Sequence, residues 1–143
     1  MELFRISGIY GPGRNLIERL RRGGYVAVAW DPPRYANRIH VDDLVEGVVA
    51  AIARPRPGRV VNLTDDLPSP HADYVRALAR AAGAPDPLVL APEEARRRLS
   101  PDYLAFFRAN RRVSNRLLHR ELLPRLRYPS FRAALPSLLA GGA

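Results

Sequence analysis

Short apolar runs alternate with helix-like segments along the first 90 residues, and Gly or Pro stands at nearly every junction between them. The runs rich in β-forming residues, which we expect to be strands, are 3–6, 25–30, 38–41, 59–63 and 88–90. Between them, apolar side chains recur at helical spacing in 15–22, 42–53 and 69–82. Because strands that alternate with helices are typical of parallel sheets covered by helices, the sequence predicts the α/β fold class.

The remainder of the chain is expected to be helical, in pieces at 92–99, 101–109, 114–123 and 130–139. A length of 143 residues suffices for one domain. The α/β pattern is incomplete, because such a domain normally opens with a strand and a Gly-rich turn that binds phosphate. The loop of Gly8, Gly11 and Gly13 has the spacing G-x-x-G-x-G, whereas dinucleotide-binding turns have G-x-G-x-x-G. This loop therefore predicts a plain turn.

Two helix starts carry residues suited to capping. Asn15 is expected to cap 15–22, and Asp42 is expected to cap 42–53. Asp43 follows in the first turn, where the helix dipole favours an acidic side chain. The apolar residues of the second helix fall on one stripe at helical spacing: Leu44, Val45, Val48, Val49 and Ile52.

The composition excludes several kinds of chemistry. All 23 basic residues are Arg, so this polypeptide offers no lysine Schiff base, no phosphate-loop lysine and no Tyr-x-x-x-Lys pair. The absence of Cys excludes disulfides and thiol catalysis. His40, His71 and His119 lack metal-site spacing, so we expect no metal. No apolar run reaches 18 residues and the first residues do not resemble a signal peptide, so we expect a cytoplasmic protein without a membrane partner.

The net charge of +9 resides in one segment. Residues 96–132 hold 11 Arg against Asp102 and Glu121, and the rest of the chain is balanced. Two interpretations stay open: a solvated segment in an Arg-rich composition, or an Arg-rich nucleic-acid-binding module. Three aromatic residues lie at helical spacing within the segment and favour core packing over a platform for stacking bases. They are Tyr103, Phe106 and Phe107.

Four blocks of the sequence resemble, in order, the C-terminal half of extended or atypical short-chain dehydrogenase/reductases, the NAD-dependent epimerase/dehydratase proteins. The first is Phe-Arg-Ile-Ser-Gly-Ile-Tyr-Gly-Pro-Gly-Arg-Asn at 4–15, and the second is Arg-Ile-His-Val-Asp-Asp-Leu at 38–44. The third is Val-Val-Asn-Leu-Thr-Asp-Asp-Leu-Pro at 60–68. The last is Asn-Arg-Arg-Val-Ser-Asn at 110–115, followed by Leu-Arg-Tyr-Pro-Ser-Phe-Arg at 126–132. The resemblance covers nearly the whole chain.

This resemblance implies the C-terminal part of a doubly wound Rossmann-type fold with a helical tail. We expect one partial domain, in which 1–68 form the end of the sheet region and 69–143 form a mostly helical substrate-side region. The family uses NAD or NADP, which we expect this chain not to bind alone, and nucleotide-linked sugars or similar small molecules as substrates. Its glycine motif and Tyr-x-x-x-Lys pair lie outside the matching blocks. The chain is therefore expected to be a truncated, split or degenerate member that has no catalytic residue and is inactive alone.

The resemblance also assigns candidate site residues. Those expected to contact the cofactor are Ile9, Tyr10 and Gly11. Those expected to contact substrate are Arg14, Arg38, His40, Arg111 and Arg112, with Arg108 as a further phosphate ligand. Planar guanidinium groups pair well with phosphate oxygens. A purely structural role competes with each assignment: Ile9 and Tyr10 as packing residues, and Arg14 as a solvated side chain.

Half of a doubly wound sheet leaves a strand edge and an apolar face uncovered, and such surfaces bind other chains. We expect strand 3–6 and the helix that carries Leu44, Val48 and Ile52 to be exposed. The chain would then form a homo-oligomer or bind a chain that supplies the Rossmann half. A non-catalytic interaction subunit is accordingly the other alternative, and nucleic acid ranks below a protein partner.

Overall fold

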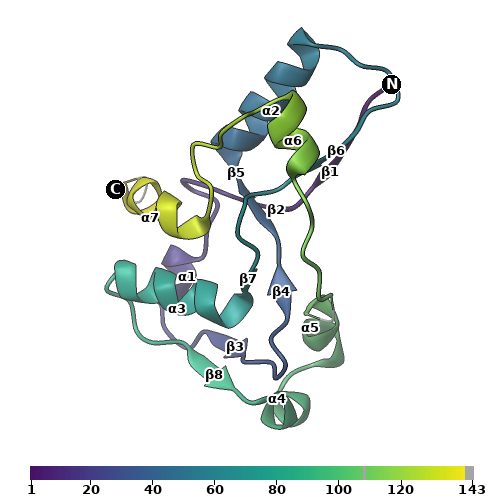
Figure 1. Cartoon of the computed structure of the whole chain (residues 1–143). Coiled ribbons are helices and arrows are strands. Elements are labelled where there is room, and N and C mark those ends of the chain that lie inside the picture. Colours follow the sequence, from purple (N-terminus) through teal and green to yellow (C-terminus); the bar gives the residue numbers. More distant parts are fainter. Residues whose placement is uncertain (108, 141–143) are drawn as a thin grey trace. The chain divides into compact units, whose positions relative to one another are not determined.

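The structure of the protein is a computed structural model, and it describes residues 1–107 and 109–140. Its helices and strands form two compact units that interleave along the chain (Figure 1). The first unit contains residues 1–14, 37–68 and the described part of 113–143. The second contains residues 15–36 and the described part of 69–112. Each unit is therefore assembled from segments that are distant in the sequence.

Two pairs of parallel strands form the centre of the first unit. Strand β1 (Leu3–Ile6) pairs with β6 (Val60–Leu63), and β2 (Gly8–Tyr10) pairs with β5 (Arg38–His40). Because β1 and β2 follow each other directly, residues 3–10 run as one nearly continuous extended segment with a different partner for each part. This arrangement explains why the first and second resemblance blocks lie next to each other in space.

Three helices complete the first unit: α2 (Val41–Ala53), α6 (Arg116–Glu121) and α7 (Phe131–Ala140). Helix α6 lies beside α2 (Figure 1), and Gly47 of α2 faces the buried side chains, since a Cβ there would stand 3.2 Å from Leu63 and 3.6 Å from Leu118. Apolar side chains from the strands and from both helices form one buried cluster. Its members are Ile39, Ala51, Val61, Leu63, Leu118, Leu122 and Leu126.

The second unit has its own strands, helices and core. Its elements are α1 (Ile17–Arg21), β3 (Val26–Val28), β4 (Tyr35–Ala36), β7 (Ser69–Pro70), α3 (His71–Ala81), β8 (Leu88–Leu90), α4 (Pro92–Arg98) and α5 (Pro101–Phe106). Strand β3 is parallel to β8, whereas β4 is antiparallel to β7. Val28, Leu90 and Ala95 form a small buried cluster, and α3 buries Val75 and Leu78.

The predicted α/β fold class is confirmed. Three of the four strand pairs in the described residues are parallel, and the chain closes with α6 and α7 as a helical tail. Helix α2 joins β5 to β6, each of which is parallel to its own partner strand. The pattern of alternating strands and helices was therefore sufficient to predict the class.

Three local predictions were wrong. Gly8–Tyr10, expected in a turn, is strand β2, because its backbone pairs with Arg38–His40. Helix α2 begins at Val41, and the cap is His40: its Nδ1 accepts the backbone N–H of Asp42 at 3.2 Å. Ser69–Pro70, expected to start a helix, forms strand β7 instead. Strand pairing with a distant segment replaces the local preference at Gly8–Tyr10 and at Ser69–Pro70, whereas the His40 cap is a local contact, made two residues before the expected cap Asp42.

The apolar residues of α2 do not all face the core. Leu44 and Val48 pack partly against the buried cluster, whereas Val45, Val49 and Ile52 are 54%, 58% and 74% exposed. We call these last three residues the exposed stripe of α2. Leu3 and Ile6 of β1 are also about half exposed. Uncovered apolar surface on β1 and on this helix was predicted, but of the helix residues named for it only Ile52 is exposed, since Leu44 and Val48 are partly buried.

Candidate functional site

The pairing of β2 with β5 places Tyr10 directly opposite His40. Both residues are buried, and the edge of the Tyr10 ring meets the His40 ring with centroids 5.4 Å apart at 88°. The Tyr128 ring also packs against the His40 imidazole, with 3.9 Å between the two ring centroids. Gly11 follows in the same segment, where a Cβ would come within 2.6 Å of the Val41 side chain. This cluster therefore requires a glycine at the end of β2.

The hydrogen bonding of His40 determines its protonation. Its Nδ1 accepts the Asp42 N–H, so the proton of the neutral ring is on Nε2. Burial lowers the pKa of His40 and outweighs the opposing effects of the Asp42 and Asp43 carboxylates. The ring is thus neutral at pH 7, and its buried Nε2 has no hydrogen-bond partner in residues 1–107 and 109–140.

Asp43 fixes the segment that carries Tyr128. Its fully buried carboxylate accepts the backbone N–H of Arg127 at 2.7 Å and of Tyr128 at 2.9 Å. Charged acceptors make strong hydrogen bonds, so this side chain fixes the Tyr128 ring against His40. The expectation of a mere first-turn acid was incomplete, because the sequence does not show which chain segment lies above α2.

A buried carboxyl group lies at the end of β6. The backbone N–H of Asp65 donates to the Arg38 carbonyl at 2.7 Å, and the Thr64 hydroxyl donates to the same oxygen at 3.2 Å. Burial raises the pKa of Asp65 to about 7, although the Arg38 guanidinium opposes the shift. The Oδ1 atom of Asp65 is buried and has no hydrogen-bond partner within the described part of the chain. Asp65 is therefore close to half protonated at neutral pH.

The neighbouring Asp66 forms an ion pair. Its Oδ1 lies 2.6 Å from His119 Nε2 and 2.6 Å from Asn115 Nδ2. His119 Nδ1 faces the Leu123 carbonyl at 2.9 Å, and Nε2 lies between the Asp66 carboxylate and, at 3.2 Å, the Asn115 amide nitrogen. Burial lowers the pKa of His119, but its contacts with Asp66 and with the Leu123 and Pro124 carbonyls outweigh this and raise the pKa. We call this pair the Asp66–His119 clamp.

The structure brings together most of the candidate residues. Ile9, Tyr10 and Gly11 are at β2, Arg38 and His40 form the paired strand, and Arg14 exchanges backbone hydrogen bonds with Gly11. Arg111 and Arg112 belong to the second unit, where the Arg112 guanidinium lies 3.8 Å over the Tyr35 ring. Arg108 lies outside the described residues. Asp65 was not among the site residues assigned from the sequence, although two adjacent acids directly after a buried strand are a signal for it.

Several arginines of the Arg-rich segment are engaged within the described residues. Arg96 pairs with Glu93 and Arg98 with Glu94, each at 2.8 Å. Arg120 pairs with Glu121, and Arg112 stacks on an aromatic ring. Because these side chains are engaged inside their own units, the structure does not favour a nucleic-acid-binding module.

The described residues hold no group of three or more His, Asp or Glu side chains that could bind a metal ion. Among the helices in the part of the chain that the structure covers, none is long and apolar enough to cross a membrane. The polar and aromatic groups that the described part of the site does contain are the Tyr10 and Tyr128 rings, the His40 imidazole, the Asp65 carboxyl and arginine side chains.

No protein-family profile matches the chain, and no curated protein matches its sequence. Solved structures do match it. A functionally unknown conserved protein from Silicibacter pomeroyi is 37% identical with a TM-score of 0.89, and the match covers 97% of this chain and 48% of that one. A human epimerase family protein solved with NADPH is 16% identical with a TM-score of 0.73, covering 97% and 48%. A UDP-glucuronic acid 4-epimerase from Bacillus cereus, solved with NAD, is 16% identical with a TM-score of 0.65, covering 98% and 44%.

The chain thus spans about half the length of the solved structures that it matches. At the level of the fold, these matches confirm the resemblance to NAD-dependent epimerase/dehydratase and short-chain dehydrogenase/reductase proteins, and the length agrees with a C-terminal half. The matched α/β architecture is Rossmann-like, with parallel strands and a helical tail.

Proposed function

We propose that this chain is the substrate-side half of an NAD(P)-dependent epimerase, dehydratase or oxidoreductase that acts on a nucleotide-linked sugar or a similar small molecule. The observation that carries the proposal is the fold match over nearly the whole chain to solved structures about twice as long, several of which contain NAD or NADPH. One of these was solved with UDP-glucuronic acid, and another is a UDP-glucuronic acid 4-epimerase. The sequence-based assignment of 1–68 to the sheet and 69–143 to the substrate side is part of this proposal.

The residues of this chain could form part of a cofactor-binding site, but they do not form a complete one. Gly11 brings backbone close to Val41 and to His40, whose Nε2 lies 3.8 Å from the position of a Gly11 Cβ. The chain has no G-x-G-x-x-G turn and no lysine, so other residues must bind the pyrophosphate and supply the Tyr-x-x-x-Lys pair. When bound, the nicotinamide would accept or donate the hydride. This chain would contribute Ile9, Tyr10 and Gly11 to its binding.

The substrate side of the proposal rests on Arg14, Arg38 and His40 in the first unit and on Arg111 and Arg112 in the second. His40 is neutral and donates through Nε2, so it suits a hydroxyl or carbonyl oxygen better than a phosphate. Arginine suits the diphosphate of a nucleotide-linked sugar. No residue of this chain is assigned a proton transfer, and the chain alone is expected to be inactive.

A polypeptide that supplies the nucleotide-binding half is the partner that fits the uncovered surface. The exposed stripe of α2 and the half-exposed Leu3 and Ile6 offer apolar area that water now contacts. Strand β1 pairs only with β6 among the described strands, so its sheet has open edges. Adding strands and apolar side chains there would cover both features.

The experiment co-expresses this chain with the first half of the Silicibacter pomeroyi protein. We expect the two to co-purify and the complex to bind NADPH, followed by its fluorescence. Val49→Lys, in the exposed stripe, should abolish co-purification, whereas Ala133→Lys, on an exposed position of α7, should leave it intact. A chain that stays monomeric by light scattering and captures no nucleotide-binding half would refute the proposal.

A second measurement tests the site within the assembled protein. Substituting His40→Asn should weaken binding of UDP-glucuronic acid by at least tenfold and leave NADPH binding within a factor of two. Arg76→Gln, an exposed change on α3, is the control and should alter neither affinity. Equal losses of substrate and cofactor affinity would show instead that His40 serves only the packing of the Tyr10 and Tyr128 rings.

A further inference from the structure

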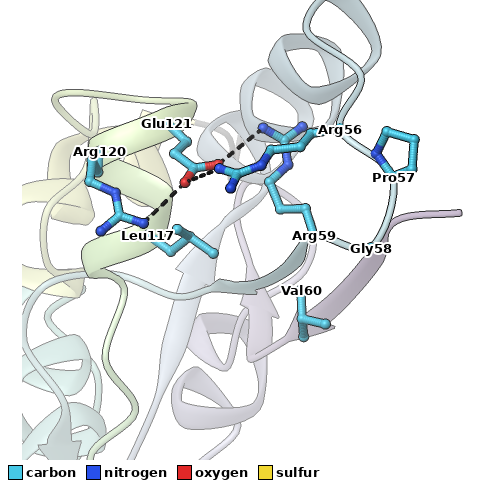
Figure 2. Close-up of a pocket in the computed structure, with 8 residues that line it drawn as sticks. All are labelled: Arg56, Pro57, Gly58, Arg59, Val60, Leu117, Arg120 and Glu121. Carbon is cyan, nitrogen blue, oxygen red and sulfur yellow. Dashed lines mark hydrogen bonds and ion pairs between the residues drawn. The ribbon is translucent and has the colours of Figure 1, made fainter.

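A pocket of about 290 Å³ lies in the first unit, at the end of β6 opposite to Asp65. Figure 2 shows the arginine side chains directed at Glu121, and Val60 and Leu117 supply apolar side chains to the lining. The lining residues are Arg56, Pro57, Gly58, Arg59, Val60, Leu117, Arg120 and Glu121. None of them belongs to the candidate site above, so an inference from this pocket stands or falls independently of the proposed function.

Arg59 is the fixed element of the pocket. Its side chain is 3% exposed, its Nε and Nη2 donate to Glu2 Oε2 at 3.0 and 2.7 Å, and its Nη2 also donates to the Arg54 carbonyl. Its Nη1 approaches Glu121 only at 3.6 Å and makes no hydrogen bond with the described residues. A buried guanidinium that retains an unused donor in a pocket is prepared for an oxygen acceptor.

Two further guanidinium groups have unused donors. Arg56 uses Nη1 on Glu121 at 2.6 Å, and Arg120 uses Nη2 on the same oxygen at 3.1 Å. Their remaining side-chain nitrogens have no partner in the part of the chain that the structure describes. Three guanidinium groups thus surround one carboxylate, and the lining carries a net charge of +2.

We propose that this pocket binds a small organic anion, in which a carboxylate or phosphate group contacts Arg56, Arg59 and Arg120 and an apolar body lies on Val60 and Leu117. The arrangement around Glu121 already shows that the three arginines can converge on one oxyanion. Arginine pairs with carboxylate and phosphate through parallel N–H donors, and here each arginine still has donors available. The volume is at the lower limit of ligand pockets, so a compact ligand fits and a dinucleotide does not.

Glu121 has a specific role in this proposal. It balances part of the arginine charge in the empty pocket, and it repels an incoming anion at the same time. The surrounding arginines lower the pKa of Glu121, so the carboxylate is ionised at neutral pH. Removing its charge without changing its shape should therefore strengthen anion binding.

The test is calorimetric titration of the full chain at constant ionic strength with benzoate, with acetate as the probe that lacks the apolar body. We expect saturable binding of benzoate, at least tenfold tighter than acetate. The double variant Arg56→Gln/Arg120→Gln should weaken benzoate binding at least tenfold, and Glu121→Gln should tighten it several-fold. The control is Arg96→Gln/Arg98→Gln, which removes the same charge from two exposed Arg–Glu pairs of α4 and should change nothing.

Phosphate is titrated as a second oxyanion, and its binding should show the same dependence on Arg56 and Arg120. Circular dichroism of each variant verifies that the fold is retained, and Glu121→Gln serves as the informative variant if the double variant unfolds. The proposal is overturned by the absence of saturable benzoate binding, by equal losses in the double variant and its control, or by weaker binding in Glu121→Gln.

Discussion

Substituting Asp65→Asn should remove a large pH dependence of folding stability. The pKa of Asp65 is about 7 in the folded chain against an ordinary value of 3.8, a difference of about three units. One unit corresponds to about 1.4 kcal/mol, so ionising Asp65 opposes folding by about 4 kcal/mol. Between pH 4 and 7 the folded protein retains a proton that the unfolded chain has lost. Stability contributed by this group is therefore present at low pH and is lost as the pH rises through 7.

The assay is urea denaturation followed by circular dichroism at steps between pH 4.5 and 8.5. Asn resembles the neutral carboxyl group, so the variant should gain stability relative to the wild type as the pH rises, by about 3 kcal/mol over this range, since part of the total change lies below pH 4.5. Asp73→Asn, an exposed change on α3, is the control and should follow the wild type in parallel. A difference between Asp65→Asn and the wild type that is constant from pH 4.5 to 8.5 would refute the argument that burial controls this carboxyl.

Three further perturbations follow from the first unit. The pKa of His119 is raised in the folded chain, so the Asp66–His119 clamp should contribute stability below about pH 6.5 and lose it as the pH rises through the folded pKa. Asp66→Asn should lower the pKa of His119 in an NMR titration. An unchanged titration would contradict the ion pair. Gly11→Ala places a Cβ 2.6 Å from a Val41 methyl group and should lower the free energy of unfolding by about 1–3 kcal/mol in a denaturation experiment. Adding Val41→Ala should restore most of this loss. If the effects of the two substitutions were simply additive, the clash would be excluded. Asp43→Ala leaves two part-buried backbone N–H donors without their charged acceptor and should cost about 2–3 kcal/mol, measured as a lower midpoint in urea. A loss below about 1 kcal/mol would show that water replaces the carboxylate.

The fold class could be predicted from the sequence more reliably than the short strands and close contacts could, and the reason is physical. Helical and strand periodicity depend on long runs, and α2 and α3 were recognisable from their apolar spacing. Strand β2 has three residues, one of them Gly8, and it exists because β5 lies beside it. The inward face of α2 is selected by Gly47, where a Cβ would stand 3.2 Å from Leu63, and not by the largest apolar side chains. Short elements and close approaches are properties of tertiary contacts, which one sequence does not display.

The candidate site likewise contains residues that the sequence identified and residues whose role it did not reveal. Tyr10 and His40 were assigned through a resemblance between motifs, and the strand register places them opposite each other. Asp43 and Asp65 were underestimated, because an acidic residue in a sequence does not reveal whether it is buried. Their burial depends on segments far along the chain, including the one that carries Tyr128. A sequence motif therefore indicates which residue types lie in the site, whereas burial, which depends on distant segments, determines their chemical properties.

The interleaving of the two units has a consequence for biosynthesis. When a ribosome has released the chain as far as residue 112, the described strands of the first unit have emerged, but α6 has not. Leu118, Leu122 and Leu126 supply three of the seven buried side chains of that unit's cluster. Its strands must therefore wait with an unfilled core while the second unit, whose segments end at residue 112, is already complete. A nascent chain stalled near that point should be the form most dependent on chaperones.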